Sequence, residues 1–297
     1  MTQTRRVLLV VHAERPEAVL VAREVAAALR ESGLEVRAQA EAELGLAGVV
    51  LAEAPDAADD CELVVVVGGD GTMLRGAELA RPHDVPILGL NLGRVGFLAE
   101  AEREQASVVV RAVVERTWTV EERTTLEVVV TRDGEEIART WALNEASVEK
   151  ASRERMLEVL VEVDGRPLSR WGADGVVAAT PTGSTAYAFS AGGPVVWPEV
   201  EALLVVPISA HALFARPLVV APTSTIAVEV LSEHAQAVMW CDGRRLVELP
   251  TGSRVEITRH PEPVRFARLH AAPFTDRLVA KFALPVQGWR GRPEKPA

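Results

Sequence analysis

The sequence is poor in the features that mark exported, membrane and metal-cluster proteins. Its two cysteines, Cys61 and Cys241, lie far apart and form no CxxC, so they predict neither a disulfide framework nor a zinc site. No apolar run approaches the roughly 20 residues of a membrane span. The apolar run Val7–Val11 is too short for a signal peptide and predicts a first strand. We therefore expect a cytoplasmic protein that does not cross or bind a membrane.

Positive charge is also scarce. The net charge is −10 and lysines are few, which argues against a general nucleic-acid-binding role. The chain contains no GK[ST] phosphate loop, no GxGxxG fingerprint and no GxSxG elbow. It also has no Cys/His cluster that would hold a metal tightly. A phosphate site would have to depend on backbone NH groups, a metal ion and a few basic side chains.

The first part of the chain alternates strand and helix patterns. Apolar runs rich in β-branched residues predict strands, and apolar residues at helical spacing predict helices. This alternation predicts an α/β domain with an open, mostly parallel sheet. The predicted strands are Val7–Val11, Leu34–Ala38, Leu63–Val67 and Pro86–Leu90, and the predicted helices are Pro16–Leu29, Met73–Ala80 and about Glu102–Glu115.

The pattern changes near Trp118 to short β-rich runs separated by Asp-Gly turns. We expect residues 118–271 to form a mainly β, sandwich-like domain and residues 1–117 to form the α/β domain. The segment Thr275–Leu284 regains helical spacing, and residues 272–297 are expected to pack back on the first domain. The predicted strands of the second domain are Leu126–Val130, Val159–Val163, Val176–Ala179, Ile226–Val230 and Val255–Thr258.

A glycine-rich loop, GGDGT at 68–72, follows the valine-rich strand and precedes a helix. Glycines let a ligand approach the backbone, and NH groups at a helix N-terminus favour anions. Ligands of open α/β sheets bind at the carboxyl ends of strands, where this loop lies. Asp70 suits a hydroxyl acceptor or a metal better than a phosphate. The alternative is a plain glycine turn in which Asp70 caps the helix.

Two further polar segments lie in the β-rich part. Asn144-Glu145 combines an amide with a carboxylate, which suits the vicinal hydroxyls of a sugar, although such a pair is also common in turns and caps. Residues 180–187, TPTGSTAY, follow a predicted strand and contain the only tyrosine, Tyr187. This loop could present hydroxyls and backbone groups to a polar ring or a phosphate. Alternatively, its hydroxyls bond to their own backbone.

Together these segments resemble the NAD kinase family. The motifs stand here as GGDGT (68–72), GLNLGRVGFLAE (89–100), NE (144–145) and DGVVAATPTGSTAYAFSAGGP (174–194), in the family's order and spacing. The resemblance runs from about residue 5 to about residue 290, and HALFARPLV and CDGRR look like actinobacterial members. It implies an α/β domain, a β-sandwich-like domain and a site between them.

The resemblance also implies the chemistry. The γ-phosphoryl of ATP, or polyphosphate in some bacterial members, would pass to the 2′-hydroxyl of the adenosine ribose of NAD, giving NADP. Asp70 would be the general base, Mg²⁺ would arrive with the donor, and the enzyme would be a homodimer or homotetramer in which Asp174 reaches the neighbouring subunit's site. The implied NAD- and nucleotide-binding residues are Gly68, Gly69, Gly71, Arg75, Asn144, Glu145, Arg155, Asp174, Thr185, Ala186, Tyr187 and Ser190.

Two positions depart from the family pattern. Gly172 stands where some members carry a basic residue, and Arg244 stands where some carry a glutamine. Both departures concern how the ends of NAD are held, not the reaction. Two other functions remain open: a kinase of the same superfamily that acts on a lipid or a sugar phosphate, and a non-catalytic dinucleotide sensor. The sensor could dispense with Asp70, which is present.

Overall fold

A computed structural model describes residues 4–40, 45–92, 96–99, 101–102, 105–152, 155–232, 235–270 and 273–286. The chain divides into two compact units. Unit 1 lies within Met1–Glu122 and Arg265–Ala297, and unit 2 is Arg123–Val264. The sequence alone placed these divisions at 117/118 and 271/272.

Unit 1 contains an eight-stranded sheet with the order β3-β2-β1-β4-β5-β20-β7, and β6 pairs with β5. The pairings from β3 through to β20, and that of β5 with β6, are all parallel. The expected open, mostly parallel α/β sheet is therefore confirmed. Its strands are β1 (Arg6–Val11), β2 (Glu35–Gln39), β3 (Val50–Ala52), β4 (Leu63–Val67), β5 (Ile87–Asn91), β6 (Ala101–Glu102), β7 (Thr119–Arg123) and β20 (Val264–Arg268).

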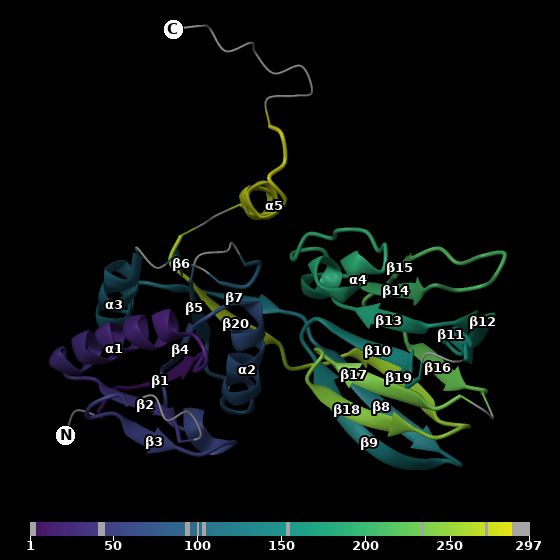
Figure 1. Ribbon diagram of the computed structural model, residues 1–297, viewed down its shortest axis with the longest axis horizontal. Helices are drawn as coiled ribbons and strands as arrows, with labels where there is room; N and C mark the ends of the chain where they lie inside the picture. The colour runs from purple at the N-terminus through teal and green to yellow at the C-terminus, as the bar shows by residue number, and fades with distance from the viewer. Residues whose placement is uncertain are drawn as a thin grey trace, which may run out of the picture. The chain divides into compact units, whose positions relative to one another are not determined.

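The fully buried strand β4 has helices packed against both of its faces (Figure 1). Its residues Leu63, Val65 and Val67 share a core with α1 and α3. The other face carries Val66 and approaches α2 so closely that a Cβ on Gly76 would lie 2.6 Å from a Val66 methyl. The helices of this unit are α1 (Pro16–Glu31), α2 (Asp70–Ala80), α3 (Ala106–Glu115) and α5 (Phe274–Phe282), with short 3-10 turns at η1 (Asp56–Ala58) and η2 (Arg81–His83).

Helix boundaries differ from the sequence-based expectations at two places. The expectation that α3 begins near Glu102 is wrong, because residues 101–102 pair with β5 as strand β6. Helix α2 begins at Asp70, inside the glycine motif, and its N-cap is Gly69. Asp70 is thus the first helical residue and not the cap.

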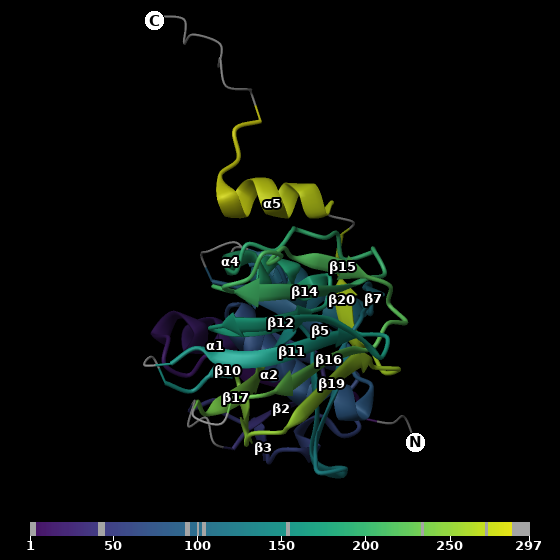
Figure 2. The ribbon, with the colours of Figure 1, turned by 90° about the vertical axis from the view of Figure 1, so that its right-hand side faces the viewer.

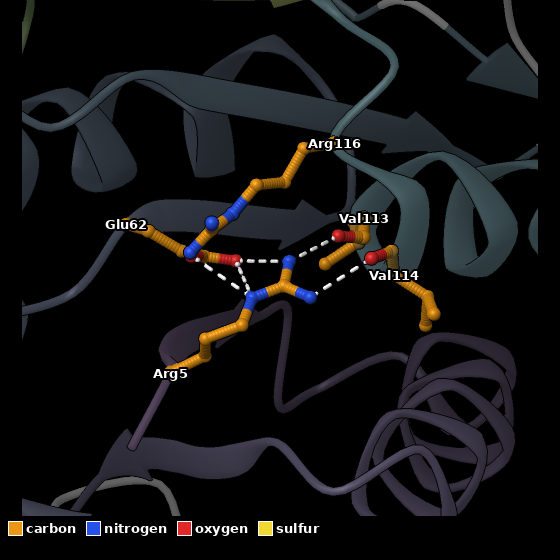
Figure 3. A network of polar contacts seen from close by, with 5 residues as sticks. All are labelled: Arg5, Glu62, Val113, Val114 and Arg116. Atoms are coloured by element: carbon orange, nitrogen blue, oxygen red, sulfur yellow. Dashed lines mark hydrogen bonds and ion pairs between the residues drawn. The ribbon is translucent and has the colours of Figure 1, made fainter. Parts of the chain in front are cut away.

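An arginine joins the ends of three elements in unit 1 (Figure 3). Arg5 precedes β1, and its guanidinium donates to Glu62, which precedes β4, and to the carbonyls of Val113 and Val114 in the last turn of α3. Arg116, in the left-handed conformation at the end of α3, donates to the same carboxylate. Burial raises the pKa of Glu62, but the two arginines outweigh it and hold that pKa below its ordinary value.

Unit 2 consists of two six-stranded antiparallel sheets, with the orders β15-β14-β13-β10-β17-β18 and β12-β11-β16-β19-β8-β9. Strands β14 and β10 of one sheet and β11 and β16 of the other can be followed in Figure 2. The strands are β8 (Leu126–Arg132), β9 (Glu135–Ala142), β10 (Glu145–Lys150), β11 (Leu157–Val163), β12 (Arg166–Ala173), β13 (Gly175–Ala179), β14 (Leu203–Ile208), β15 (Leu218–Val220), β16 (Ile226–Val230), β17 (Ala237–Cys241), β18 (Arg245–Leu249) and β19 (Arg254–Arg259).

Alternate residues of both sheets fill one core, including Val128 and Val159 of one sheet and Val148 and Met239 of the other. This confirms the sandwich-like second domain. The outer face of β13 and β14 is covered by the segment with η4 (Thr182–Thr185) and α4 (Tyr187–Ser190). Of the helices in the described part of the chain, none combines the length and apolar character needed to cross a membrane.

Candidate active site

Asp70 in unit 1 is held by a distant segment of the same unit. Its Oδ2 accepts a hydrogen bond from the backbone N–H of Phe97 and its Oδ1 accepts one from that of Leu98, each at 3.2 Å. The side chain is half-buried at the N-terminus of α2, where the helix dipole favours an anion. A carboxylate has about four lone-pair sites, so both oxygens can still accept another proton donor. The arrangement fixes the carboxylate without saturating it.

The three glycines around Asp70 differ in what they allow. A Cβ on Gly68 would lie 2.4 Å from Oγ1 of the buried Thr72, so the fold itself requires glycine there. A Cβ on Gly69 or Gly71 would meet no atom of the described residues within 4 Å. The described residues therefore leave the backbone beside Asp70 open to the approach of a ligand. Arg75, four residues after Gly71, lies on the same side of α2.

In unit 2, Asn144 and Glu145 are positioned by a buried carboxylate. Asp242 accepts hydrogen bonds from the backbone N–H groups of Leu143 at 3.0 Å, Asn144 at 2.7 Å and Glu145 at 3.4 Å. Arg245 donates to the same carboxylate at 2.8 Å. Burial raises the pKa of Asp242, and Arg245 and the backbone donors oppose that rise. Three consecutive N–H groups at the start of β10 thus converge on one side chain.

The TPTGST turn packs directly against Asn144. The N–H of Thr180 donates to the Asn144 carbonyl at 2.9 Å, and the Thr180 hydroxyl donates to the Leu143 carbonyl at 2.6 Å. A Cβ on Gly183 would lie only 2.0 Å from the Asn144 carbonyl oxygen. Some hydroxyls of this loop do bond to their own backbone, since Thr185 donates to the carbonyl of Thr182. These contacts bring the two polar segments of unit 2 together.

A cavity of about 320 Å³ lies beside these segments. The N–H of Tyr187 donates to Glu145 at 3.4 Å, and its hydroxyl donates to Glu149 at 3.2 Å. Burial, reinforced by the nearby Asp242, raises the pKa of Glu145 to about 8. Burial and Glu149 raise the pKa of Tyr187 to about 12. At neutral pH Glu145 can therefore donate to a ligand, while the Tyr187 hydroxyl donates to Glu149 and can accept a further hydrogen bond. The cavity is lined by Glu145, Ser147, Glu149, Tyr187, Trp240, Asp242 and Gly243.

The remaining expected residues of unit 2 are not among those that line this cavity. Asp174 forms an ion pair with Lys150, and this contact lowers the pKa of the Asp174 carboxyl. Arg155 lines a different cavity, of about 350 Å³, together with Gly172. Thr185 and Ala186 are half-buried before α4, and Ser190 is exposed at its end.

Several lining residues were not among the expected ones. Ser147 and Glu149 alternate with Glu145 along β10 and so point to one face of the sheet. That signal was available, but the sequence did not mark residues 145–150 as a strand. Asp242 was read only as the first residue of a turn. Its left-handed φ of 55° confirms the turn, and its carboxylate also holds the backbone N–H groups of residues 143–145.

Chelating side chains do not gather into a metal centre within the described ranges, where no group of three or more His, Cys, Asp or Glu could hold an ion.

The sequence matches two family models along most of its length. Residues 7–118 match the ATP-NAD kinase N-terminal domain and residues 143–269 match the ATP-NAD kinase C-terminal domain. An NAD kinase of Thermobifida fusca is 61% identical, over 98% of this chain and 93% of the relative. NAD kinase 2 of Streptomyces coelicolor is also 61% identical, over 99% of this chain and 100% of the relative.

Solved structures share the fold. A yeast NADH kinase complexed with NADH superimposes with a TM-score of 0.88 at 23% identity, covering 99% of this chain and 91% of that one. An NAD kinase from Archaeoglobus fulgidus in complex with ATP gives a TM-score of 0.73 at 28% identity, covering 95% of this chain and 99% of that one.

Proposed function

The chain belongs to the ATP-NAD kinase family, and we propose that it transfers the γ-phosphoryl group of ATP to the 2′-hydroxyl of the adenosine ribose of NAD, with Asp70 as the general base. The product is NADP. Membership of this family removes the lipid-kinase, sugar-phosphate-kinase and sensor alternatives. The open space beside Gly69 and Gly71, next to a fixed carboxylate, is the observation that supports a role for this loop in the reaction.

In this reaction one proton and one phosphoryl group move. An Asp70 oxygen accepts the proton of the ribose 2′-hydroxyl while the 2′-oxygen attacks the γ-phosphorus. The bond between the γ-phosphorus and the bridging oxygen breaks, and ADP leaves. Such transfer depends on positioning and charge neutralisation more than on covalent work by the protein. Gly68, Gly69 and Gly71 offer backbone approach, and Arg75 offers positive charge.

Unit 2 is proposed to bind the dinucleotide. Glu145 can donate to, or accept from, ribose hydroxyls, and the Tyr187 hydroxyl can accept from them. Asn144 precedes Glu145 in the chain. Thr185, Ala186 and Ser190 would extend this surface along η4 and α4. Arg155 would supply a positive charge where Gly172 provides none.

Mg²⁺ is proposed to arrive with ATP. When bound, it would neutralise charge on the triphosphate. Mg²⁺ in such sites is held by one or two carboxylates together with substrate phosphates. The Asp70 carboxylate, beside backbone that the described residues leave open, could lie next to such an ion.

We further propose a homodimer or homotetramer in which Asp174 contributes to the neighbouring subunit's site. Asp174 is 40% exposed and paired with Lys150 in its own chain. Co-expressed Asp70→Asn and Asp174→Ala chains should regain activity, since one site of each hybrid dimer carries both native residues. Hybrids with only summed residual activity would refute the shared site. Polyphosphate use and a cytoplasmic location stay predictions.

The proposal is tested by incubating the protein with ATP, Mg²⁺ and NAD and reading out the product with an NADP-specific dehydrogenase. We expect NADP to form with ATP as donor. EDTA should abolish turnover, and added Mg²⁺ should restore it with no change in thermal midpoint. Phosphorylation at a position that the dehydrogenase does not recognise would contradict the assignment of the 2′-hydroxyl.

A further inference from the structure

The segment of residues 96–99 in unit 1 has its backbone held by side chains. Its N–H groups at Phe97 and Leu98 donate to Asp70. On the carbonyl side, Arg277 donates to Phe97 at 2.9 Å and to Ala99 at 3.3 Å, and Arg268 donates to Leu98 at 3.3 Å. The segment therefore connects the Asp70 carboxylate to two arginines from the last part of the described chain.

The aromatic side chain of this segment packs on the same helix that carries Arg277. The Phe97 ring centroid lies 6.0 Å from that of Phe274 and 5.9 Å from that of Phe282. The Lys281 ammonium lies 5.7 Å from the Phe97 centroid. Phe274, Arg277, Lys281 and Phe282 recur at helical spacing, so one face of α5 meets the segment.

The segment also lies very close to Asp70. A Cβ on Gly96 would lie 2.5 Å from Oδ1 of Asp70, so glycine permits this approach. Since both carboxylate oxygens bond to the segment, its displacement would release or turn the carboxylate. Misplacement of a catalytic group by about 1 Å can cost on the order of 100-fold in rate.

We infer that Arg277 of α5 is a positioning residue, which sets the orientation of Asp70 by holding the carbonyls of the 96–99 segment. This inference rests on the proposed role of Asp70 as general base. Helix α5 then takes part in the reaction without touching a substrate.

The test compares Arg277→Met with Asp276→Asn in the full-length protein. Methionine keeps much of the apolar stem but removes both hydrogen bonds. Asp276 is exposed on the same helix and serves as the control. We expect Arg277→Met to lower kcat about 10- to 100-fold with both KM values nearly unchanged. The control should retain wild-type kcat, and Arg277→Lys should recover part of the loss.

Two further measurements separate positioning from general destabilisation. Hydrogen exchange at the Phe97 and Leu98 amides should accelerate in Arg277→Met, while the β4 amides keep their protection. In an Asp70→Asn background, Arg277→Met should lower kcat no further, because the group it positions is already lost. If Arg277→Met does not fold, Phe282→Leu, which removes one ring contact with Phe97, undergoes the same measurements.

The possible failures are distinguishable. If Asp70→Asn keeps its kcat, the proposed function of Asp70 fails. If Asp70→Asn loses its kcat but Arg277→Met keeps wild-type kcat or unchanged amide exchange, only the positioning role fails. An equal further loss in the Asp70→Asn background would also overturn it, because Arg277 would then act independently of Asp70.

Discussion

The two units place their carboxylates by different physical means. Asp70 in unit 1 is half-buried and is oriented by two backbone donors from a segment that follows it in the chain. Glu145 in unit 2 is buried next to Asp242, and that burial keeps it protonated at neutral pH. A protonated Glu145 can donate to a ligand's oxygen as well as accept from a hydroxyl. This contrast agrees with the proposal that the chemistry belongs to unit 1 and dinucleotide binding to unit 2.

The largest expected effect is that of Asp70→Asn. An amide keeps the shape and can still accept one backbone hydrogen bond, but it cannot accept the proton. We expect kcat to fall about 10²- to 10⁴-fold, the range of general-base assistance. Steady-state kinetics with saturating ATP would measure it. If kcat survives and only KM for NAD rises, Asp70 is a binding residue and the division between the units is wrong.

The next effect concerns Glu145→Gln, which should act on binding. Loss of a neutral hydrogen bond to a ligand's hydroxyl amounts to about 0.5–1.5 kcal/mol, so KM for NAD should rise about 2- to 10-fold. The value of kcat at saturating NAD should change little. A loss in kcat equal to that of Asp70→Asn would place Glu145 in the chemical step instead.

The same variant has a stability signature. Because the pKa of Glu145 is raised to about 8, its contribution to folding is full below its unfolded pKa and is lost as pH rises through 8. Glutamine does not ionise, so the variant lacks this pH-dependent contribution to stability. Thermal midpoints measured from pH 5 to pH 9 should therefore fall less steeply for Glu145→Gln than for the native protein. Parallel curves would mean that Glu145 is ionised throughout.

Two glycines of the 68–72 loop in unit 1 should separate an effect on folding from an effect on ATP binding. Gly68→Ala should destabilise the fold by about 1–3 kcal/mol, because its Cβ would overlap Thr72. Gly71→Ala meets open space and should leave the denaturation midpoint unchanged or higher. We expect it to lower kcat/KM for ATP about tenfold, close to 1.4 kcal/mol, if the donor approaches there. Unchanged kinetics for Gly71→Ala would place the donor elsewhere.

The smallest expected effect lies in the arginine cluster at Glu62, away from the proposed site. Its lowered pKa means that the stabilisation is present above the unfolded pKa and is lost as pH falls through the folded one. Glu62→Gln should cost about 1 kcal/mol at neutral pH and less at low pH, as measured by urea denaturation. Glu136→Gln, in an exposed pair with Arg139, is the matched control and should change nothing measurable. A reduced kcat in Glu62→Gln would mean that residues outside the 68–72 loop also contribute to catalysis.

Local signals in the sequence predicted much of this fold. The valine run Leu63–Val67 predicted a buried parallel strand, and β4 has those bounds. The Asp-Gly turns at 133, 164 and 242 have left-handed φ values at both residues, as hairpins require. Each feature depends on a few consecutive residues, which is why it can be read from sequence.

Features that depend on distant partners could not be read in this way. Strand β20 lies between β5 and β7 in the sheet of unit 1, although more than a hundred residues of unit 2 precede it. The role of Asp242 depends on three N–H groups from an earlier segment, and that of Arg277 on residues 96–99. The resemblance to the NAD kinase family pointed to Asp70, Glu145 and Tyr187, but only the folded structure shows the contacts that orient them.

The most direct test of this account is the affinity of each variant for NAD, measured by titration calorimetry without ATP. The account predicts that Asp70→Asn binds NAD within about twofold of the native protein while forming almost no NADP. It predicts that Glu145→Gln binds NAD about 2- to 10-fold more weakly. Loss of NAD binding in Asp70→Asn, with native affinity in Glu145→Gln, would contradict the assignment of chemistry to unit 1 and binding to unit 2.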